Sequence, residues 1–262
     1  MKIAAMTVCC VDRYTQHDAD RVGGNSVNVA THCRLAGAED VSVIGCVGED
    51  AFGGMVRDHL RNHGIDTSHL SARSGRTTTQ KIYIEDDGTL SYPPDAHDAG
   101  VSQAYAPSEE DWSFAMGHDI LSIPSLDPRF REALDRIGNG TQLVIDFLHT
   151  RDYALVQTSL PIASLLFMSA DDGAVDRMRS LSAGSDVPMI LTLGERGSVA
   201  LVKGQTFFQE ALAAGPVVDT TGCGDAYQGA FVVSWFEHGD IAKAMQAGAQ
   251  AASHILTHLG AV

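Results

Sequence analysis

The sequence predicts an α/β protein in which one domain, residues 1–262, carries a small β lid. Three observations lead to this prediction. Apolar strand patterns alternate with helical patterns from the N-terminus onward, which is the order that builds a parallel sheet. A polar stretch with strand periodicity then interrupts this alternation. The 262 residues, 44% of them hydrophobic, suffice for one sizeable core, and no linker, low-complexity tract or internal repeat divides them.

The first strand is predicted at Lys2–Val11, where a run of small and apolar residues ends at Asp12. Ligands of open α/β sheets bind at the carboxyl ends of the strands, so Asp12 stands where a site is expected. After a polar segment, Gly23-Gly24-Asn25 precedes a helix predicted at Ser26–Ala36. Asn28 lies on the first turn of that helix.

A lid is predicted from a stretch in which the α/β rhythm stops. Thr77–Ile84 contains β-branched residues in the alternating pattern of a strand. Asp86-Asp87-Gly88 is predicted to form a turn, and Thr89–Tyr92 is predicted to return as a second strand. We expect residues 13–24 and 75–100 to form this lid together.

The remaining elements follow from the same patterns. Strands are predicted at Val41–Val47, Leu143–Phe147, Leu165–Met168 and Met189–Leu193, with a hairpin at Lys203-Gly204. Three helices are predicted by their ranges, between Asp50 and Gly64, at Ala226–His238 and at Asp240–Leu259. Two more are predicted by their start signals, a capping box at Ser108–Asp111 and the pair Asp127-Pro128. In the last helix, the small residues from Ala247 to Ala252 permit either tight helix packing or contact with a flat ligand such as adenine.

The stretch Val218–Tyr227 carries the most chemistry, and it joins an expected strand to a long apolar helix. Gly222 and Gly224 flank the small Cys223, so the backbone turns tightly and presents consecutive N–H groups at the helix start. A carboxylate at Asp225 repels a bound phosphate, but it suits a base that takes the proton of a substrate hydroxyl. The glycine-loop amides would then hold the transferring phosphoryl group. The stretch therefore predicts phosphoryl transfer.

Other motifs with similar residues do not fit. The dinucleotide pattern G-x-G-x-x-G fails because Tyr227 stands at the third glycine position, and the chain has no Gly-Lys pair for a Walker A loop. The phospho-aspartate loop of ion-pump ATPases has Thr where Cys223 stands. An N-cap at Asp225 after a glycine turn remains as a structural alternative, and the motif alone does not decide between the two.

Composition narrows the partners to small molecules. The net charge of −15, from 18 basic and 33 acidic residues, disfavours nucleic acid and anionic membranes. Five cysteines without a C-x-x-C pair fit a reducing compartment, and no stretch resembles a signal peptide or a membrane span, so we expect a cytoplasmic protein. The pairs His59/His63 and His254/His258 have the spacing of metal ligands, but 11 histidines make chance pairs expected.

Four motifs in order carry a resemblance to a known family. They are Gly23-Gly24-Asn25-x-x-Asn28-x-Ala30, Gly45-x-x-Gly48-x-Asp50-x-x-Gly53, Thr192-Leu193-Gly194-Glu195-x-Gly197 and Asp219-Thr220-x-Gly222-x-Gly224-Asp225. With them the chain resembles the PfkB (ribokinase-like) carbohydrate kinases over nearly its whole length. Within that family, the opening Cys10-Val11-Asp12-x-Tyr14 and the ending His258-Leu259-Gly260-Ala261 look most like the bacterial fructoselysine 6-kinases.

The resemblance implies a three-layer α/β/α sandwich with a mostly parallel sheet and a β lid. It implies transfer of the ATP γ-phosphate, with Mg²⁺, to a hydroxyl of a sugar or sugar-amine conjugate. A fructoselysine-type ketosamine is favoured as the acceptor, with fructokinase or nucleoside kinase activity as the alternative. A monovalent cation as a further cofactor and a homodimer formed through the lid are also compatible with it.

The resemblance assigns roles to residues by position. Asp225 matches the catalytic base, and Gly222, Cys223 and Gly224 match the anion hole. The positions on the sugar side are Asp12, Gly23, Gly24, Asn25 and Asn28. The positions on the nucleotide side are Thr192, Gly194, Glu195, Gly197, Thr220, Ala249 and Ala252.

The chain departs from the family pattern at three places. Thr7-Val8 stands where the family has Gly and a polar residue, and Ser169–Asp172 is only a faint counterpart of its magnesium-linked Asn-x-x-Glu segment, so no metal ligand is assigned. These two departures motivate a rival hypothesis, a non-catalytic nucleotide or sugar sensor. Cys223 stands where the family has Ala: its thiol either faces the phosphoryl path with a pKa lowered by the helix start, or points into the core and is inert.

Overall fold

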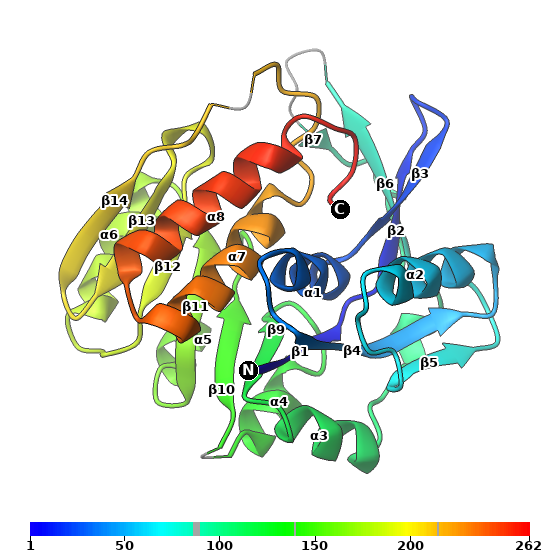
Figure 1. Ribbon diagram of the computed structural model, residues 1–262, viewed down its shortest axis with the longest axis horizontal. Coiled ribbons are helices and arrows are strands. Elements are labelled where there is room, and N and C mark those ends of the chain that lie inside the picture. The colour runs from blue at the N-terminus through cyan, green and yellow to red at the C-terminus, as the bar shows by residue number, and fades with distance from the viewer. Residues whose placement is uncertain (86–89, 139, 214) are drawn as a thin grey trace.

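The computed structural model describes residues 1–85, 90–138, 140–213 and 215–262 (Figure 1). The core strands are β1 (Lys2–Thr7), β4 (Asp40–Gly48), β5 (Leu70–Arg73), β9 (Ile120–Pro124), β10 (Gln142–Asp146), β11 (Ala163–Ser169), β12 (Met189–Thr192), β13 (Ser198–Val202) and β14 (Gln205–Gln209). Within the described residues they form one nine-stranded sheet in the order β14-β13-β12-β11-β10-β9-β1-β4-β5. Neighbours from β5 to β12 are parallel, and β13 and β14 form an antiparallel edge.

Helices cover both faces of this sheet. One layer contains α1 (Asn25–Leu35), α2 (Ala51–Asn62), α7 (Cys223–His238) and α8 (Ile241–Ile255), and the other contains α3 (Glu109–Met116), α4 (Phe130–Arg136), α5 (Tyr153–Ser159) and α6 (Asp172–Ser182). Strand residues alternate between the two layers: Val43 packs with the first, whereas Ile44 packs with the second. The predicted three-layer α/β/α fold is confirmed. None of the helices described has the length and apolar character that crossing a bilayer requires.

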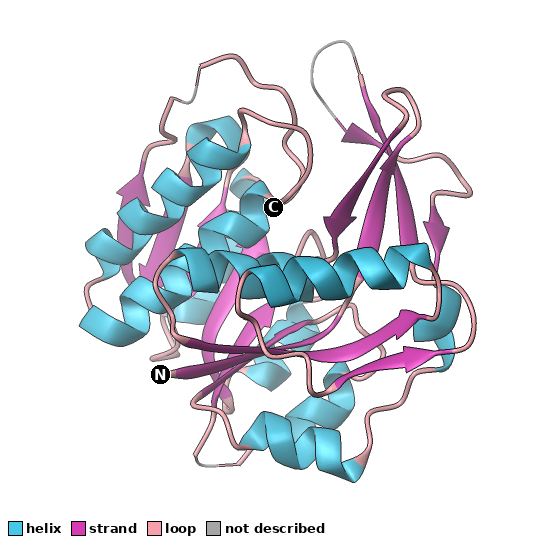
Figure 2. Cartoon of the chain, turned by 45° about the vertical axis from the view of Figure 1, so that its right-hand side comes forward, coloured by secondary structure: helices cyan, strands magenta, loops and turns pink. Residues whose placement is uncertain are grey.

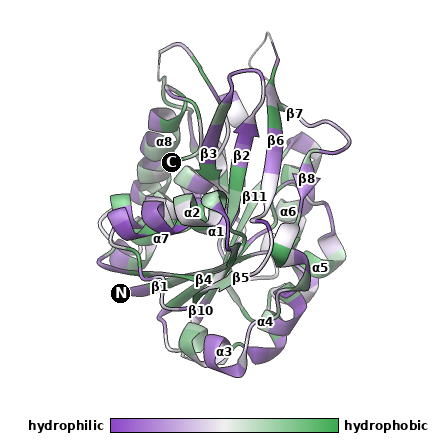
Figure 3. Ribbon diagram, turned by 90° about the vertical axis from the view of Figure 1, so that its right-hand side faces the viewer, coloured by the Kyte–Doolittle hydropathy of each residue, from purple (hydrophilic) through white to green (hydrophobic). Residues whose placement is uncertain are grey.

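A second, smaller sheet stands beside the core. Its strands are β2 (Cys10–Tyr14), β3 (Ala19–Gly23), β6 (Thr79–Ile84), β7 (Leu90–Ser91) and β8 (His97–Asp98). Their order is β3-β2-β6-β7, with β8 paired to β6. Figure 2 shows this sheet projecting from the core, and Figure 3 shows β2, β3 and β6 side by side with hydrophilic and hydrophobic residues along them. It occupies the part of the chain where a lid was predicted, although the predicted turn Asp86-Asp87-Gly88 lies outside the described residues.

The single strand predicted at Lys2–Val11 is wrong, because the chain leaves the core sheet after Thr7. Thr7 has φ 93°, and the chain then enters the smaller sheet as β2. Ser26 stabilises the break: its Oγ accepts from Val8 N at 3.0 Å and donates to Met6 O at 2.7 Å. Residues on both sides of the break are buried, so hydrophobicity alone does not reveal it. Asp12 therefore lies within a strand of the smaller sheet.

Several element boundaries also differ from the predictions. The helix predicted from Asp127-Pro128 begins at Phe130, because the Asp127 side chain first closes a turn by accepting from Arg129 N at 2.8 Å. The segment before the glycine motif is loop and not strand, and α7 begins at Cys223. Helix α8 ends at Ile255, four residues early, and the next carbonyl, of Leu256, accepts from Val218 N at 2.8 Å. The short elements β5, β9, α5 and α6 were not predicted.

Two predicted local motifs are confirmed. Ser108 and Asp111 form the reciprocal capping box of α3. Lys203 and Gly204, both with positive φ, join β13 to β14 as a tight hairpin.

The small residues of α8 allow close packing against α7. A Cβ added at Gly248 would lie 2.9 Å from three ring carbons of Tyr227. That ring is buried, and its hydroxyl is hydrogen-bonded to Ser198 Oγ at 2.8 Å, so it has little freedom to move. The helix-packing alternative is therefore the correct one at Gly248.

We expect Gly248→Ala to destabilise the fold by about 1 to 3 kcal/mol, because the new methyl group overlaps the Tyr227 ring. The matched control is Gly54→Ala in α2, where an added Cβ meets no atom within 4 Å. The control should gain about 0.5 to 1 kcal/mol from the better helix propensity of alanine. Urea unfolding measures both values, and equal shifts in the two variants would contradict this account of the packing.

Candidate active site

The predicted site residues converge at the carboxyl ends of the central strands. Strand order reverses at β1, which has β9 on one side and β4 on the other, and such a reversal opens a crevice at that end of the sheet. Asp146 is the last residue of β10, and helices α1 and α7 pack against each other with Asn25 and Cys223 as their first residues. Hydrogen bonds from the first turn of α1 reach both Asp146 and the first turn of α7, so the three elements meet at this edge.

Asp225 is held by two asparagine amides. Asn25 Nδ2 donates to Asp225 Oδ1 at 2.8 Å, and Asn28 Nδ2 donates to Asp225 Oδ2 at 2.7 Å. Asn25 Nδ2 also donates to Asp146 Oδ2 at 2.9 Å. One amide group therefore links two carboxylates that belong to different elements. This arrangement fixes the orientation of Asp225, which remains partly exposed.

Burial brings the pKa values of both carboxyl groups close to neutrality. It raises the pKa of Asp225 to about 6, although the bonds from Asn28 and Asn25 act in the opposite direction. Burial and the nearby Asp225 raise the pKa of Asp146 to about 7, against the lowering effect of the Leu148 N–H and of Asn25. A general base works best with a pKa near the working pH. Asp225 therefore has the protonation behaviour that a base requires.

Asp12 approaches the same crevice from the smaller sheet. It is 5% exposed, and its carboxylate meets no hydrogen-bond donor among the residues that the structure describes. Burial and the charges of Asp225 and Asp219 raise its pKa to about 7. Gly23 on the neighbouring strand leaves room for this carboxylate, since a Cβ there would lie 2.0 Å from Asp12 Oδ2. Gly24, with φ 94°, leads from that strand into α1.

Glycine at position 222 is required by both conformation and space. Its φ is 75°, and a Cβ there would lie 2.2 Å from the Cβ of Ala261. No side chain of the described residues caps the start of α7, but Cys223 N donates to the Thr220 carbonyl at 3.3 Å, so the Gly222 and Gly224 amides are the ones available to an anion. Gly224 is exposed, with no atom within 4 Å of an added Cβ, and Thr220 is likewise exposed. The helix start therefore has an open approach, as an anion hole needs.

The Cys223 thiol points away from that approach. Its Sγ donates to Ala252 O of α8 at 3.7 Å. Burial, with Asp219 and Asp225 nearby, raises the pKa of the thiol to about 12. The hypothesis of a thiol activated by the helix start is therefore wrong, and the inward-facing alternative holds. Only the Cys223 backbone is left as a candidate contact for phosphate.

The predicted nucleotide-side residues lie at the end of β12. Thr192 is its last residue, and Gly194 and Gly197, with φ of 62° and 89°, form the turn to β13 around the half-turn Gly194–Arg196. Glu195 lines a hollow of about 650 Å³, whose other walls include Phe208. The hollow has room for a ligand, but Ala249 and Ala252 of α8 do not line it. Ala249 is buried in the core.

Sequence reasoning missed two acidic residues of this region. Asp146 fell within the strand predicted at Leu143–Phe147 and was given no role, although a carboxylate at or near the carboxyl end of a parallel strand was a usable signal. Asp219 is fully buried and accepts from Tyr14 Oη at 2.6 Å. No pattern in the sequence indicated this contact, because the two residues are 205 positions apart.

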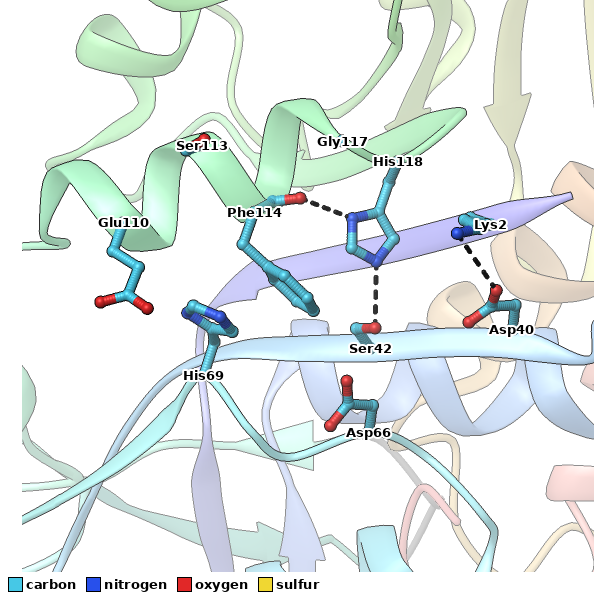
Figure 4. Close-up of a pocket in the computed structure, with 10 residues that line it drawn as sticks. All are labelled: Lys2, Asp40, Ser42, Asp66, His69, Glu110, Ser113, Phe114, Gly117 and His118. Atoms are coloured by element: carbon cyan, nitrogen blue, oxygen red, sulfur yellow. Dashed lines mark hydrogen bonds and ion pairs between the residues drawn. The ribbon is translucent and has the colours of Figure 1, made fainter.

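A second hollow, of about 570 Å³, lies near the amino ends of β1 and β4 (Figure 4). Its side chains bond mainly to one another and to nearby backbone: His118 bonds Ser42 Oγ at 3.0 Å and Phe114 O at 2.8 Å, and Lys2 pairs with Asp40. His69 stacks on Phe114 with ring centroids 3.9 Å apart. None of the predicted site residues lines this hollow, and its contacts are accounted for by packing.

Both members of the pair His59/His63 have structural partners. His59 Nε2 lies 3.0 Å from Thr31 Oγ1, and His63 Nδ1 lies 2.8 Å from the His59 carbonyl oxygen. Across the described residues, no three His, Cys, Asp or Glu side chains gather in a metal-binding group. Magnesium in phosphoryl transfer usually takes only one or two carboxylates and completes its shell with phosphates and water. The crevice carboxylates fit that requirement.

Comparisons with known proteins agree with the fold. A family model described as pfkB family carbohydrate kinase matches residues 10–262. The fructoselysine 6-kinase of Shigella flexneri is 30% identical over 256 residues, which cover 96% of each chain. The nucleoside kinase of Methanocaldococcus jannaschii has a TM-score of 0.80 at 20% identity, covering 100% of this chain and 93% of that one. Arabidopsis thaliana ribokinase, complexed with ribose and ATP, has a TM-score of 0.79 at 19% identity, and the match covers 99% of this chain and 94% of that one.

We expect Asp12→Asn to stabilise the protein at pH 8 by about 1 to 3 kcal/mol. The pKa of Asp12 is raised from 3.8 to about 7, so the folded state holds a proton that the unfolded state releases between these pH values. The stability of the native protein should therefore fall as pH rises from about 4 to 7. The asparagine side chain of the variant does not titrate, so the variant avoids this loss. The gain should be smaller at pH 5.

The matched control is Asp18→Asn, which removes the same charge from an exposed lid turn whose φ of 47° suits asparagine. Thermal unfolding at both pH values measures the difference. If Asp18→Asn stabilised the protein as much as Asp12→Asn, the stabilisation would come from the change in net charge and not from the burial of Asp12.

Proposed function

Since the chain belongs to the pfkB family of carbohydrate kinases and is an ATP-dependent kinase, we propose that it phosphorylates a hydroxyl of a sugar-amine conjugate of the fructoselysine type. Kinases among its relatives leave the non-catalytic sensor without support, so that hypothesis is not retained. The choice of acceptor class rests on one feature of the site, the charge of its crevice.

Three carboxyl groups lie near one another at the candidate site, and no lysine or arginine among the described residues pairs with any of them. Asp12, Asp146 and Asp225 are all buried enough to raise their pKa values, and no lysine or arginine of the described chain lowers any of them. Arg21 is opposite Asp12 in the register of β2 and β3, but its guanidinium donates to the Asp20 carbonyl. Buried carboxylates favour a positively charged partner. A ketosamine carries a secondary ammonium group beside its sugar ring, whereas fructose and nucleosides are neutral.

The proposed reaction uses Asp225 as the base. Its carboxylate takes the proton of the acceptor hydroxyl, the acceptor oxygen bonds to the γ-phosphorus, and the bond between that phosphorus and the β-phosphate bridging oxygen breaks to release ADP. The amides of Gly222 and Gly224 stabilise the charge on the transferring group, and the Cys223 amide joins them by exchanging its bond to the Thr220 carbonyl for one to a phosphoryl oxygen. Magnesium, when bound, neutralises the β- and γ-phosphates. Closure of residues 13–24 and 75–100 over the crevice would exclude water, and pairing of two such lids in a homodimer remains a prediction.

We expect Asp225→Asn to lower kcat by about 10²- to 10⁴-fold, because the amide cannot accept the hydroxyl proton. In the native enzyme, kcat/KM should rise with pH between about 6 and 7, where Asp225, Asp12 and Asp146 lose protons as a coupled group. The matched control is Asp240→Asn, at the N-cap of α8, where asparagine caps equally well. Native turnover in the Asp225 variant would remove this residue as the base.

We expect the wild-type enzyme to phosphorylate fructoselysine with a higher kcat/KM than fructose, adenosine or inosine. A neutral fructoselysine analogue with an ether oxygen in place of the amine should be a poorer acceptor. Asp12→Asn should reduce the preference for the cationic acceptor about 10-fold, and Asp18→Asn should leave it unchanged. Mass spectrometry of the phosphorylated products measures these ratios. Equal or faster phosphorylation of a neutral sugar or nucleoside would refute the ketosamine proposal.

A further inference from the structure

Asp219 is a buried carboxylate that joins three separate parts of the chain. It is fully buried, and both of its oxygens accept two hydrogen bonds. Thr221 donates to Oδ1 through its backbone N at 2.8 Å and its Oγ1 at 2.7 Å. Gly260 N donates to Oδ2 at 2.9 Å, and Tyr14 Oη donates to the same oxygen at 2.6 Å.

Tyr14 reaches this carboxylate from the smaller sheet. It is the last residue of β2, is fully buried, and pairs with Ala19 of β3 and Ile82 of β6. Burial and the bond to Asp219 raise the pKa of its hydroxyl, so it stays a hydrogen-bond donor at neutral pH. Its hydroxyl is thus the direct polar link between the smaller sheet and the loop that precedes α7.

The other end of the network sets the position of Gly222. Gly260 is bonded to Asp219, and the next residue, Ala261, occupies the space where a Gly222 side chain would be. The Ala261 carbonyl is held in turn by His32 Nε2 at 2.9 Å. Thr221, bonded twice to Asp219, directly precedes Gly222. A shift of Asp219 would therefore move the turn that presents the first amides of α7.

We propose that Tyr14 is a positioning residue for phosphoryl transfer, which fixes the anion-binding turn at Gly222 through Asp219 and so couples that turn to the lid sheet. The inference rests on the proposed role of the α7 amides. Tyr14 itself touches neither substrate in this arrangement, because its hydroxyl is used by Asp219. Its contribution should therefore appear in the rate of transfer and not in substrate affinity.

Tyr14→Phe tests the proposal, since it removes one oxygen atom and keeps the buried ring. The charged and fully buried Asp219 carboxylate then loses one of its hydrogen-bond donors. We expect this carboxylate to move in order to regain a donor. We expect kcat to fall about 10- to 100-fold, with KM for MgATP and for fructoselysine within about twofold of the native values. Release of phosphate from MgATP without acceptor should fall by a similar factor. This second measurement does not depend on the identity of the acceptor.

Tyr105→Phe is the matched control. Tyr105 is also buried, but its hydroxyl has no hydrogen-bond partner in the described part of the chain. It should keep native kcat. Asp219→Asn should lower kcat as well, and the double variant Tyr14→Phe/Asp219→Asn should be no slower than the slower single variant, because both act through one contact.

Three results would overturn the proposal: a kcat within twofold of native in Tyr14→Phe, an equal loss in Tyr105→Phe, or a multiplicative loss in the double variant. Failure of the proposed function is visible separately. A wild-type enzyme inactive on fructoselysine would refute the acceptor, and native turnover in Asp225→Asn would refute the base. In both cases, the rate of phosphate release from MgATP without acceptor, compared between the native enzyme and Tyr14→Phe, still tests the role of Tyr14.

Discussion

The burial of several carboxyl groups at one edge of the sheet, with no lysine or arginine of the described residues paired to them, is the constraint on which this structure depends. Buried carboxylates are costly unless donors surround them. Here the donors are amides of Asn25 and Asn28 for Asp225, and backbone and hydroxyl groups for Asp219. The start of α1, the start of α7 and the first strand of the smaller sheet are each positioned by that need for donors. What the fold gains is a crevice with acidic groups that titrate near neutral pH.

The exit of the chain from the core sheet at Thr7 makes this arrangement possible. If β1 continued as the sequence suggests, Asp12 would extend beyond the sheet edge, and the smaller sheet would lose its central strand β2. The break instead directs the chain into the smaller sheet, so that Asp12 lies close enough to Asp225 and Asp219 for their charges to raise its pKa. A positive φ at a threonine is energetically unfavourable, and Ser26 compensates by bonding to the backbone on both sides of the break.

The fold class could be predicted from the sequence, and a candidate site could be named, because both depend on local patterns. Alternating strand and helix periodicity predicted an α/β protein with a parallel sheet, and the family resemblance added the three layers. The spacing of Gly222, Gly224 and Asp225 placed a carboxylate on the first turn of a helix. The orientation of Cys223 could not be predicted, since it depends on a carbonyl of α8. The same holds for the contact between Asp219 and Tyr14, which lie 205 positions apart in the sequence. The break at Thr7 stayed hidden because both flanking segments are equally buried.

The network at Asp219 also has a consequence for the order of folding. Its bonds close loops of 205 residues to Tyr14 and 41 residues to Gly260, whereas the contacts within each helix and hairpin are local. Closing a long loop costs chain entropy before any contact compensates for it. Contacts between residues far apart in the sequence therefore form late. The layered core can therefore assemble before the crevice is complete. During refolding, secondary structure would return first, and catalytic competence would follow as a distinct, slower event.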